Sequence, residues 1–164
     1  CKLLDEVVKE VQGIEVKEEI DVQIDLKVSS FIPDEYIENS SQKIEVYQNI
    51  ALARNERDLE NVTDEMIDRY GVMPEEVNNL LEVARIKELA KKAFITKISQ
   101  RKESVVMNFE ADKFNMDIID KLIKTYRNEI KFSPGKEPYI TYKITENSDA
   151  VILKKVKDFL KEIG

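Results

Sequence analysis

Apolar side chains occupy every second position from Ile20 to Val28, and polar side chains fill the positions between them. A period of two places the two kinds of side chain on opposite faces of a β-strand. Pro33 follows shortly afterwards, and residues 34–36 have the composition of a turn. The pattern therefore predicts a strand over about 20–28 that buries one face, exposes the other and ends before Pro33.

Residues 40–93 show the helical period instead. Asn39 and Gln42 have the spacing of a capping box at the start of a first helix. A short second helix is expected around 64–70, before Gly71, and Pro74 opens a long third helix because proline suits a first helical turn. The expected inward side chains are Ile44, Tyr47, Ile50 and Ala51 in the first helix, Met66, Ile67 and Tyr70 in the second, and Val77, Leu80, Leu81, Ala84, Ile86, Leu89, Ala90 and Ala93 in the third.

After Phe94 the pattern changes from helices alone to strands that alternate with helices. The predicted strands are 95–99, 104–110 and 139–145. Two further helices are predicted, one capped by Asn115 and one capped by residues 147–149. The short polar connection between the first two of these strands favours antiparallel pairing.

The order of the elements predicts an α+β fold, in which a small mixed or antiparallel sheet packs with several helices and the helical segment spans about 40–93. Residues 1–13 also show a helical period, and the chain does not begin with Met. We expect residues 1–164 to form one domain of a larger protein, with the helix at 1–13 linking it to domains that are absent here. The alternative is a complete small protein with a processed N-terminus.

Charge divides the chain into an acidic and a basic part, although the formal total is −7. The first 90 residues carry 22 acidic and 10 basic side chains, whereas the remainder carries 11 acidic and 16 basic ones. An acidic surface suits a basic protein partner and repels phosphate backbones. The basic part contains four bases at helical spacing, Lys121, Lys124, Arg127 and Lys131. Such bases are compatible with a contact with nucleic acid. A solvated helix face is the favoured interpretation, because no platform of interleaved aromatic side chains accompanies them.

The sequence shows almost no arrangement of side chains that is typical of a catalytic site. The chain has no histidine and a single cysteine, Cys1, so it has neither an imidazole base nor a cysteine-based zinc site. Four glycines are too few for a phosphate-binding loop. Acidic pairs such as Asp117 and Asp120 favour a solvated face in a chain so rich in acids. No apolar run approaches the ~18 residues of a membrane span, so we expect a cytoplasmic protein. From the missing motifs we expect no catalytic site, cofactor or metal.

One polar cluster stands out on the short second helix. Glu65, Asp68 and Arg69 are at positions i, i+3 and i+4, which share one helix face. A surface ion pair between Glu65 and Arg69 is the simpler interpretation. The functional hypothesis is a polar patch that docks on a complementary charged surface.

Five short segments resemble those of a known family. They are Cys1–Leu4, Ile32–Ile37, Lys43–Ala51, Glu65–Pro74 and Leu80–Lys87. In this order they resemble the C-terminal domain of the transcription-repair coupling factor (Mfd) family, whose patterns include Y-I-P-D-x-Y-I and E-L-x-D-R-F-G-x-x-P. Tyr70 stands where the family more often has Phe, a change that keeps the ring. The resemblance covers residues 1 to about 98 and is loose beyond them.

The resemblance implies a role in interaction and not a catalytic site. A full family protein is an ATP-driven DNA translocase that acts on stalled RNA polymerase and recruits repair proteins through an N-terminal UvrB-like module. ATP and Mg²⁺ belong to its motor domains, whose motifs are absent from this sequence. The C-terminal domain resembles an autoinhibitory lid that docks on the UvrB-like module and masks the surface that recruits UvrA. The family's docking contacts carry over to Glu65, Asp68 and Arg69.

Two functions are therefore open. The first is a non-catalytic, autoinhibitory interaction domain of a DNA repair translocase. Its direct partner is the UvrB-like module of the same protein, UvrA and RNA polymerase are indirect partners, and it makes little direct contact with nucleic acid and none with a membrane. The alternative is a stand-alone α/β module that binds protein or nucleic acid. Binding to DNA with a steep salt dependence would distinguish a nucleic-acid module from a lid.

Overall fold

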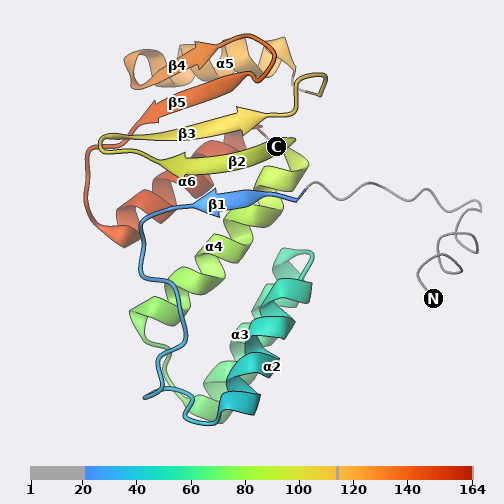
Figure 1. Ribbon diagram of the computed structural model, residues 1–164, viewed down its shortest axis with the longest axis vertical. Coiled ribbons are helices and arrows are strands. Elements are labelled where there is room, and N and C mark those ends of the chain that lie inside the picture. Colours follow the sequence, from blue (N-terminus) through green and yellow to red (C-terminus); the bar gives the residue numbers. More distant parts are fainter. Residues whose placement is uncertain (1–20, 114, 164) are drawn as a thin grey trace, which may run out of the picture.

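The computed structural model describes residues 21–113 and 115–163, so the predicted helix at 1–13 and the first residue of the predicted strand lie outside the described residues. Figure 1 shows the order of the elements along the chain. They are β1 (Gln23–Asp25), α2 (Ser40–Leu52), α3 (Glu56–Tyr70), α4 (Glu75–Lys92), β2 (Ile95–Gln100), β3 (Ser104–Phe109), α5 (Met116–Tyr126), the 3-10 turn η1 (Arg127–Glu129), β4 (Ile130–Ser133), β5 (Tyr139–Lys143) and α6 (Asp149–Ile163).

The described strands form one mixed, five-stranded sheet in the order β1-β2-β3-β5-β4. β1 runs parallel to β2, and every other neighbouring pair is antiparallel. A tight turn joins β2 to β3, and in it the Arg101 N–H donates to the carbonyl oxygen of Ser104 at 2.7 Å. The predicted α+β class and the antiparallel pairing of the segments at 95–99 and 104–110 are therefore confirmed.

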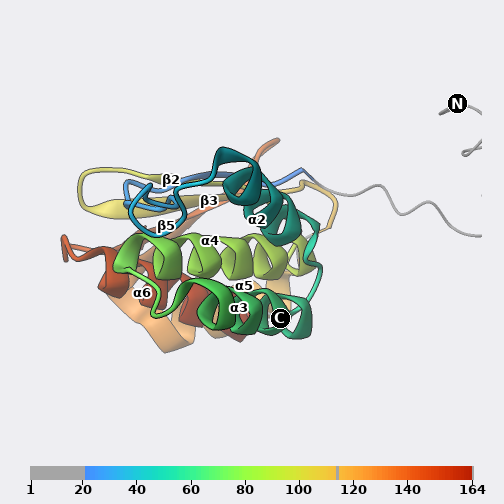
Figure 2. The same ribbon diagram turned by 90° about the horizontal axis from the view of Figure 1, so that it is seen from below.

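Helices α4, α5 and α6 cover one face of the sheet and leave the other face bare (Figures 1 and 2). The core between the sheet and these helices contains Ile98, Met107 and Ile140 from the strands and Leu122 and Phe159 from the helices. Each of these side chains is at most 1% exposed. Burial of a side chain of this size stabilises the fold by about 1.5–3 kcal/mol. The strands, α5, α6 and the C-terminal half of α4 are called the sheet lobe below.

A second core lies between α2, α3 and the N-terminal half of α4, which together are called the helical lobe. Leu59, Met66 and Leu81 are buried in it, each with at most 2% exposed surface. Helix α4 belongs to both lobes, because Leu81 lies in the helical core while Ile86 and Ala90 lie in the sheet core. One helix therefore determines how the two lobes sit relative to each other.

A network of charged side chains adds a second link between the lobes. Arg85 Nε donates to the two carboxylate oxygens of Glu56 at 2.8 and 2.9 Å, and Arg85 Nη1 donates to Glu82 at 2.9 Å. The Nζ atom of Lys157 lies 2.7 Å from the other oxygen of Glu82. Hydrogen bonds between ionised groups are stronger than neutral ones, so this network ties α3, α4 and α6 together.

Parts of the predicted inward faces of α2 and α3 are wrong. Val46 and Ile50 are the buried side chains of α2, whereas Ile44 and Ala51 are exposed. Ile67 is 44% exposed, although its neighbour Met66 is buried as predicted. Helix α2 buries only a narrow stripe of its surface. An error of one position in the predicted direction of this stripe therefore exchanges a buried side chain for an exposed one.

Helix α3 begins at Glu56 and not near residue 64. Asn55 is its N-cap, and the Asn55 Oδ1 atom accepts a hydrogen bond from the N–H of Asp58 at 2.8 Å. The first two turns contain few apolar side chains, of which Leu59 is buried and Val62 is half-buried. The apolar pattern in this part was too sparse to predict a helix, and the cap is the feature that marks its start.

The sheet also differs from the prediction. β1 contains only three residues, although the alternation of buried and exposed side chains continues to Val28. The sequence does not predict β4, and Lys131 stands on this strand instead of on a helix face. Helix α5 ends at Tyr126 because the next residue, Arg127, has a φ of 50°, in the left-handed region that interrupts a helix.

Replacement of the α3 cap should lower stability measurably. We expect Asn55→Ala to reduce the free energy of unfolding by about 1 kcal/mol, because the N–H of Asp58 loses its acceptor. Asn61→Ala is the matched control, since Asn61 is an exposed residue in the interior of the same helix. Urea denaturation of both variants measures the difference, and an equal effect of the two substitutions would contradict the assignment of the cap.

Candidate docking site

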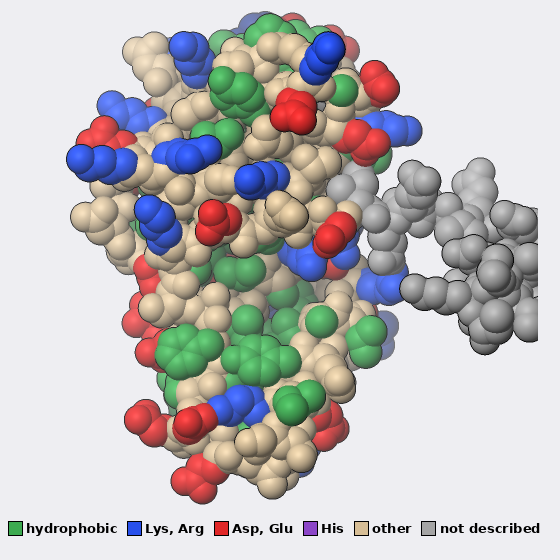
Figure 3. Space-filling model, viewed as in Figure 1, with side chains coloured by type: hydrophobic (Ala, Val, Ile, Leu, Met, Phe, Trp, Pro, Cys, Tyr) green, Lys and Arg blue, Asp and Glu red, His purple; other side chains and the backbone are tan. Residues whose placement is uncertain are grey.

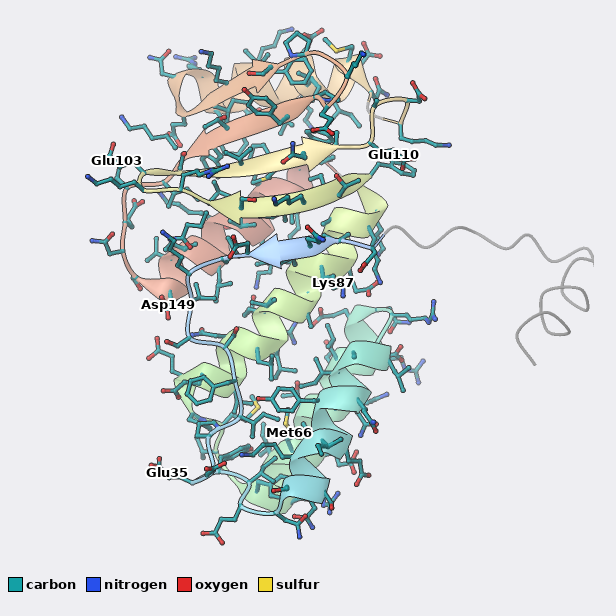
Figure 4. The ribbon with its side chains drawn as sticks, in the orientation of Figure 1. Glu35, Met66, Lys87, Glu103, Glu110 and Asp149 are labelled. Carbon is teal, nitrogen blue, oxygen red and sulfur yellow. The ribbon has the colours of Figure 1, made fainter. Side chains whose placement is uncertain are left out.

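The candidate docking site lies on an exposed face of α3 beside the stripe that packs into the helical core. Leu59 and Met66, the latter labelled in Figure 4, are the buried anchors of this helix. Glu65, Asp68 and Arg69 are all exposed. The structure therefore places the three residues singled out from the sequence on one solvent-facing surface, as their spacing predicts.

The ion pair within this surface is long and weak. The Arg69 Nη1 and Glu65 Oε1 atoms are 3.6 Å apart, and the two side chains are 43% and 57% exposed. An exposed pair at i and i+4 contributes only about 0.3–0.5 kcal/mol. Asp68 has no ion pair or hydrogen bond from its side chain within residues 21–113 and 115–163. The charges of the surface are therefore available to an external partner.

A shallow groove extends the site from α3 onto α2. Its polar lining consists of Glu65 and Arg69 of α3 and of Glu45 and Asn49 of α2, and its remaining lining residues are Val46, Val62, Met66 and Tyr70. The sequence analysis did not name Glu45 or Asn49 as site residues, although Glu45 lies in the segment 43–51 that carries the family resemblance. The groove makes the site a two-helix surface, in which two acids and one arginine lie beside apolar and aromatic side chains.

Two tyrosines support the C-terminal end of the site. The Tyr36 hydroxyl donates to the carbonyl oxygen of Gly71 at 2.8 Å, and its ring centroid lies 5.9 Å from that of Tyr70. Burial, with a smaller contribution from Tyr70, raises the pKa of Tyr36, so this phenol remains a donor at neutral pH. Gly71 has a φ of 88°, which only glycine adopts without strain, and it ends α3 directly after the site.

Tyr70 itself carries a buried polar atom with no partner. Its hydroxyl oxygen is buried and makes no hydrogen bond with the described residues. On the other side of the residue, the Arg69 guanidinium carbon lies 5.3 Å from the centroid of the Tyr70 ring, which is within the range of a cation–π contact. The ring therefore helps to position Arg69, whereas burial of the hydroxyl without a hydrogen-bond partner lowers the stability of the fold.

Neither a metal cluster nor a membrane-spanning helix is found in the described part of the chain. No three acidic or cysteine side chains in residues 21–113 and 115–163 lie close enough together to bind a metal ion. None of the helices in these ranges combines the length and the apolar character that crossing a membrane requires.

Fold and site together define a two-lobed α+β domain with an exposed, charged helix face. A family model described as the TRCF domain matches residues 26–118. The chain is 35% identical over 125 residues to a transcription-repair-coupling factor of Rickettsia prowazekii (strain Madrid E), and 32% identical over 87 residues to that of Escherichia coli (strain K12). These alignments cover 76% and 53% of this chain, but only 11% and 8% of the relatives.

A solved structure supports the same assignment at the level of the fold. The crystal structure of the C-terminal domain of a transcription-repair coupling factor matches with a TM-score of 0.82 at 22% sequence identity. The match covers 91% of this chain and 95% of the other one. The chain belongs to the TRCF domain family, and it spans about a tenth of the length of the curated relatives named above.

Removal of the unpartnered hydroxyl should stabilise the domain. We expect Tyr70→Phe to raise the free energy of unfolding by about 1 kcal/mol, because a buried hydroxyl without a partner is costly. Tyr47→Phe is the control with the opposite sign, since the Tyr47 hydroxyl accepts a hydrogen bond from the N–H of Ile32 at 2.7 Å. Thermal and urea denaturation test both, and destabilisation by Tyr70→Phe would contradict this description of the site.

Proposed function

We propose that this domain is a non-catalytic, autoinhibitory lid of a transcription-coupled DNA repair translocase. It docks on the N-terminal UvrB-like module of the same protein and masks the surface that recruits UvrA. The observation that carries the proposal is the exposed trio Glu65, Asp68 and Arg69, which lies on a helix anchored by its buried side and, among the described residues, forms one weak ion pair within itself. Membership of the TRCF domain family supports it.

The physical character of the site suits a reversible lid. Docking within one chain needs only modest affinity, because the tether supplies an effective concentration in the mM range. Charged side chains that protrude from a rigid helix provide specificity through complementary charges on the partner. The partner surface should present basic groups to Glu65 and Asp68 and an acidic group to Arg69.

In this proposal, other parts of the longer protein supply the catalytic activity and the contacts with repair proteins. ATP and Mg²⁺ act in motor domains outside this chain, so the lid needs no cofactor of its own. UvrA and RNA polymerase are then partners of the whole protein, and the domain affects them by opening or closing in the cytoplasm. In this scheme residues 1–164 are the C-terminal regulatory domain of that longer protein.

The direct test is a calorimetric titration of this domain against the separately produced N-terminal UvrB-like module at low and moderate salt. We expect saturable binding that weakens as salt rises, because exposed charges carry the contact. The substitution of Glu65, Asp68 and Arg69 by Ala together should weaken binding at least about tenfold, which corresponds to ~1.4 kcal/mol.

A matched control is available on α5. Asp117, Asp120 and Lys124 are exposed, and they also consist of two acids and one base on one helix. Their replacement by Ala changes the net charge by the same amount in the other lobe. Equal binding by the wild-type domain and the α3 variant, or an equal loss in both variants, would contradict docking through α3.

A further inference from the structure

The chain between β1 and α2 links the sheet lobe to the helical lobe. Residues 26–32 of this connection are called the strap below. Figure 1 shows the strap leaving the end of β1 and running beside α4 toward the helical lobe. It follows the shortest described strand of the sheet, which pairs with β2 alone and over three residues. The contacts of the strap therefore matter for how firmly the two lobes are joined at this edge.

Both ends of the strap are anchored by buried side chains. On the sheet side, Val22 just before β1 is 4% exposed in the sheet core. On the helical side, Ile32 is 3% exposed in the helical core, and its N–H donates to the hydroxyl of Tyr47 on α2 at 2.7 Å. Figure 3 shows hydrophobic side chains gathered over the helical lobe. The strap therefore runs between two firm anchors, one in each lobe.

The middle of the strap is attached to the sheet lobe by side-chain hydrogen bonds. The N–H of Lys27 donates to the Oε1 atom of Gln100 at 2.7 Å, and the N–H of Ser29 donates to the Oδ2 atom of Asp149 at 3.0 Å. Asp149, labelled in Figure 4, lies beside the strap in the first turn of α6. Both hydrogen bonds are exposed. Because water can replace an exposed hydrogen bond, each of them adds little net stability.

The apolar contacts of this middle part are also limited. Leu26 and Val28 pack against the sheet core but are only half-buried. The buried Asn79 of α4 donates to the carbonyl oxygen of Ser29 at 2.9 Å, and this bond belongs to the helical side. Segments with little burial and exposed hydrogen bonds open locally at a lower free energy than packed cores. We therefore expect the strap to leave the sheet lobe while both cores stay folded.

The strap leads directly to the groove between α2 and α3 at the candidate docking site. Tyr47, which binds the N–H of Ile32, stands two positions from the groove residues Glu45 and Asn49 on α2. The charged network around Arg85 links α3 to the sheet lobe, and the strap is the corresponding link for α2. Opening of the strap removes this link, so that α2 gains freedom at the groove.

We propose that residues 26–32 form a releasable strap, which is closed by Gln100 and Asp149, opens without unfolding either core and, when closed, holds α2 in place at the groove. A groove that is already ordered loses less conformational entropy when a partner binds. The closed strap therefore favours docking, and the open strap weakens it. This last step rests on the lid function proposed above, whereas the opening of the strap does not.

Hydrogen exchange of the whole chain, followed by NMR, tests whether the strap opens as one unit. We expect Asp149→Ala to accelerate exchange of the Lys27 amide about tenfold, although this amide does not bind Asp149. Gln100→Ala should likewise accelerate exchange of the Ser29 amide, whose acceptor is unchanged. Amides of β3 should change less than about twofold in both variants.

The same spectra test the link to α2. Asp149→Ala should accelerate exchange of the α2 amides about threefold. Asp149→Asn keeps an acceptor oxygen at this position and should restore exchange to within about twofold of the wild type. Asp117→Ala is the matched control, because Asp117 is the first-turn acid of α5 and its removal weakens the same kind of helix-end electrostatics. It should leave the strap and α2 unchanged.

Three results would overturn the proposal. The first is strap amides that exchange as slowly as those of β3 in the wild type. The second is acceleration, in each variant, of only the amide whose own acceptor was removed. The third is a faster strap with an unchanged α2. Equal acceleration of all amides by Asp149→Ala would mean global unfolding and would also contradict a releasable strap.

The consequence for docking is measured by calorimetric titration of the wild-type domain and the Asp149→Ala variant with the N-terminal UvrB-like module. We expect the variant to bind about threefold more weakly, although Asp149 lies on α6 and not at the α3 site. Absence of binding by the wild type would contradict the lid and leave the exchange results to decide on the strap. Wild-type binding that Asp149→Ala leaves unchanged would overturn the role of the strap in docking.

Discussion

Both lobes of the domain depend on the burial of a single helix, α4, at two places along its length. Its first half supplies Val77 and Leu81 to the helical core, and its second half supplies Ile86 and Ala90 to the sheet core. All four side chains are at most 1% exposed. The buried Asn79 also donates to the carbonyl oxygen of Ser29 at 2.9 Å, which holds the chain between β1 and α2 against the same helix. A displacement of α4 would therefore disturb both cores at once.

The same constraint fixes the direction of the α3 site relative to the sheet. α3 packs on α4 through the helical core, and Arg85 of α4 holds Glu56 of α3, so the charged face of α3 has a fixed direction. The sheet packs on the other half of α4 and turns its open face outward. The α3 site and the sheet therefore lie on different parts of one body.

The sequence predicts those parts of the fold that local chemistry determines. The caps Asn39 and Asn115, the first turn after Pro74 and the period-two segments at 95–110 lie where the patterns placed them. β4 was missed because only four residues form it and only the three-residue turn η1 separates it from α5, so that Lys131 continued an apparent helical spacing. Its position depends on pairing with β5, and only the tertiary structure supplies that partner.

The shared helix face of the three candidate residues was easier to predict than the residues around it. Three residues at i, i+3 and i+4 share a face in any helix, so Glu65, Asp68 and Arg69 needed only the correct assignment of a helix. The groove residues Glu45 and Asn49 come from another helix, and no local pattern pairs them with α3. The buried hydroxyl of Tyr70 likewise becomes visible only in the packed structure, because the sequence shows a ring similar to the family's Phe.

The central claim, that the α3 face holds a lid closed, is tested most directly by the affinity of the full-length repair factor for UvrA. The account predicts that substitution of Glu65, Asp68 and Arg69 by Ala in the full-length protein raises this affinity toward that of a protein without the domain. An unchanged affinity for UvrA, with the domain still folded, would contradict the account.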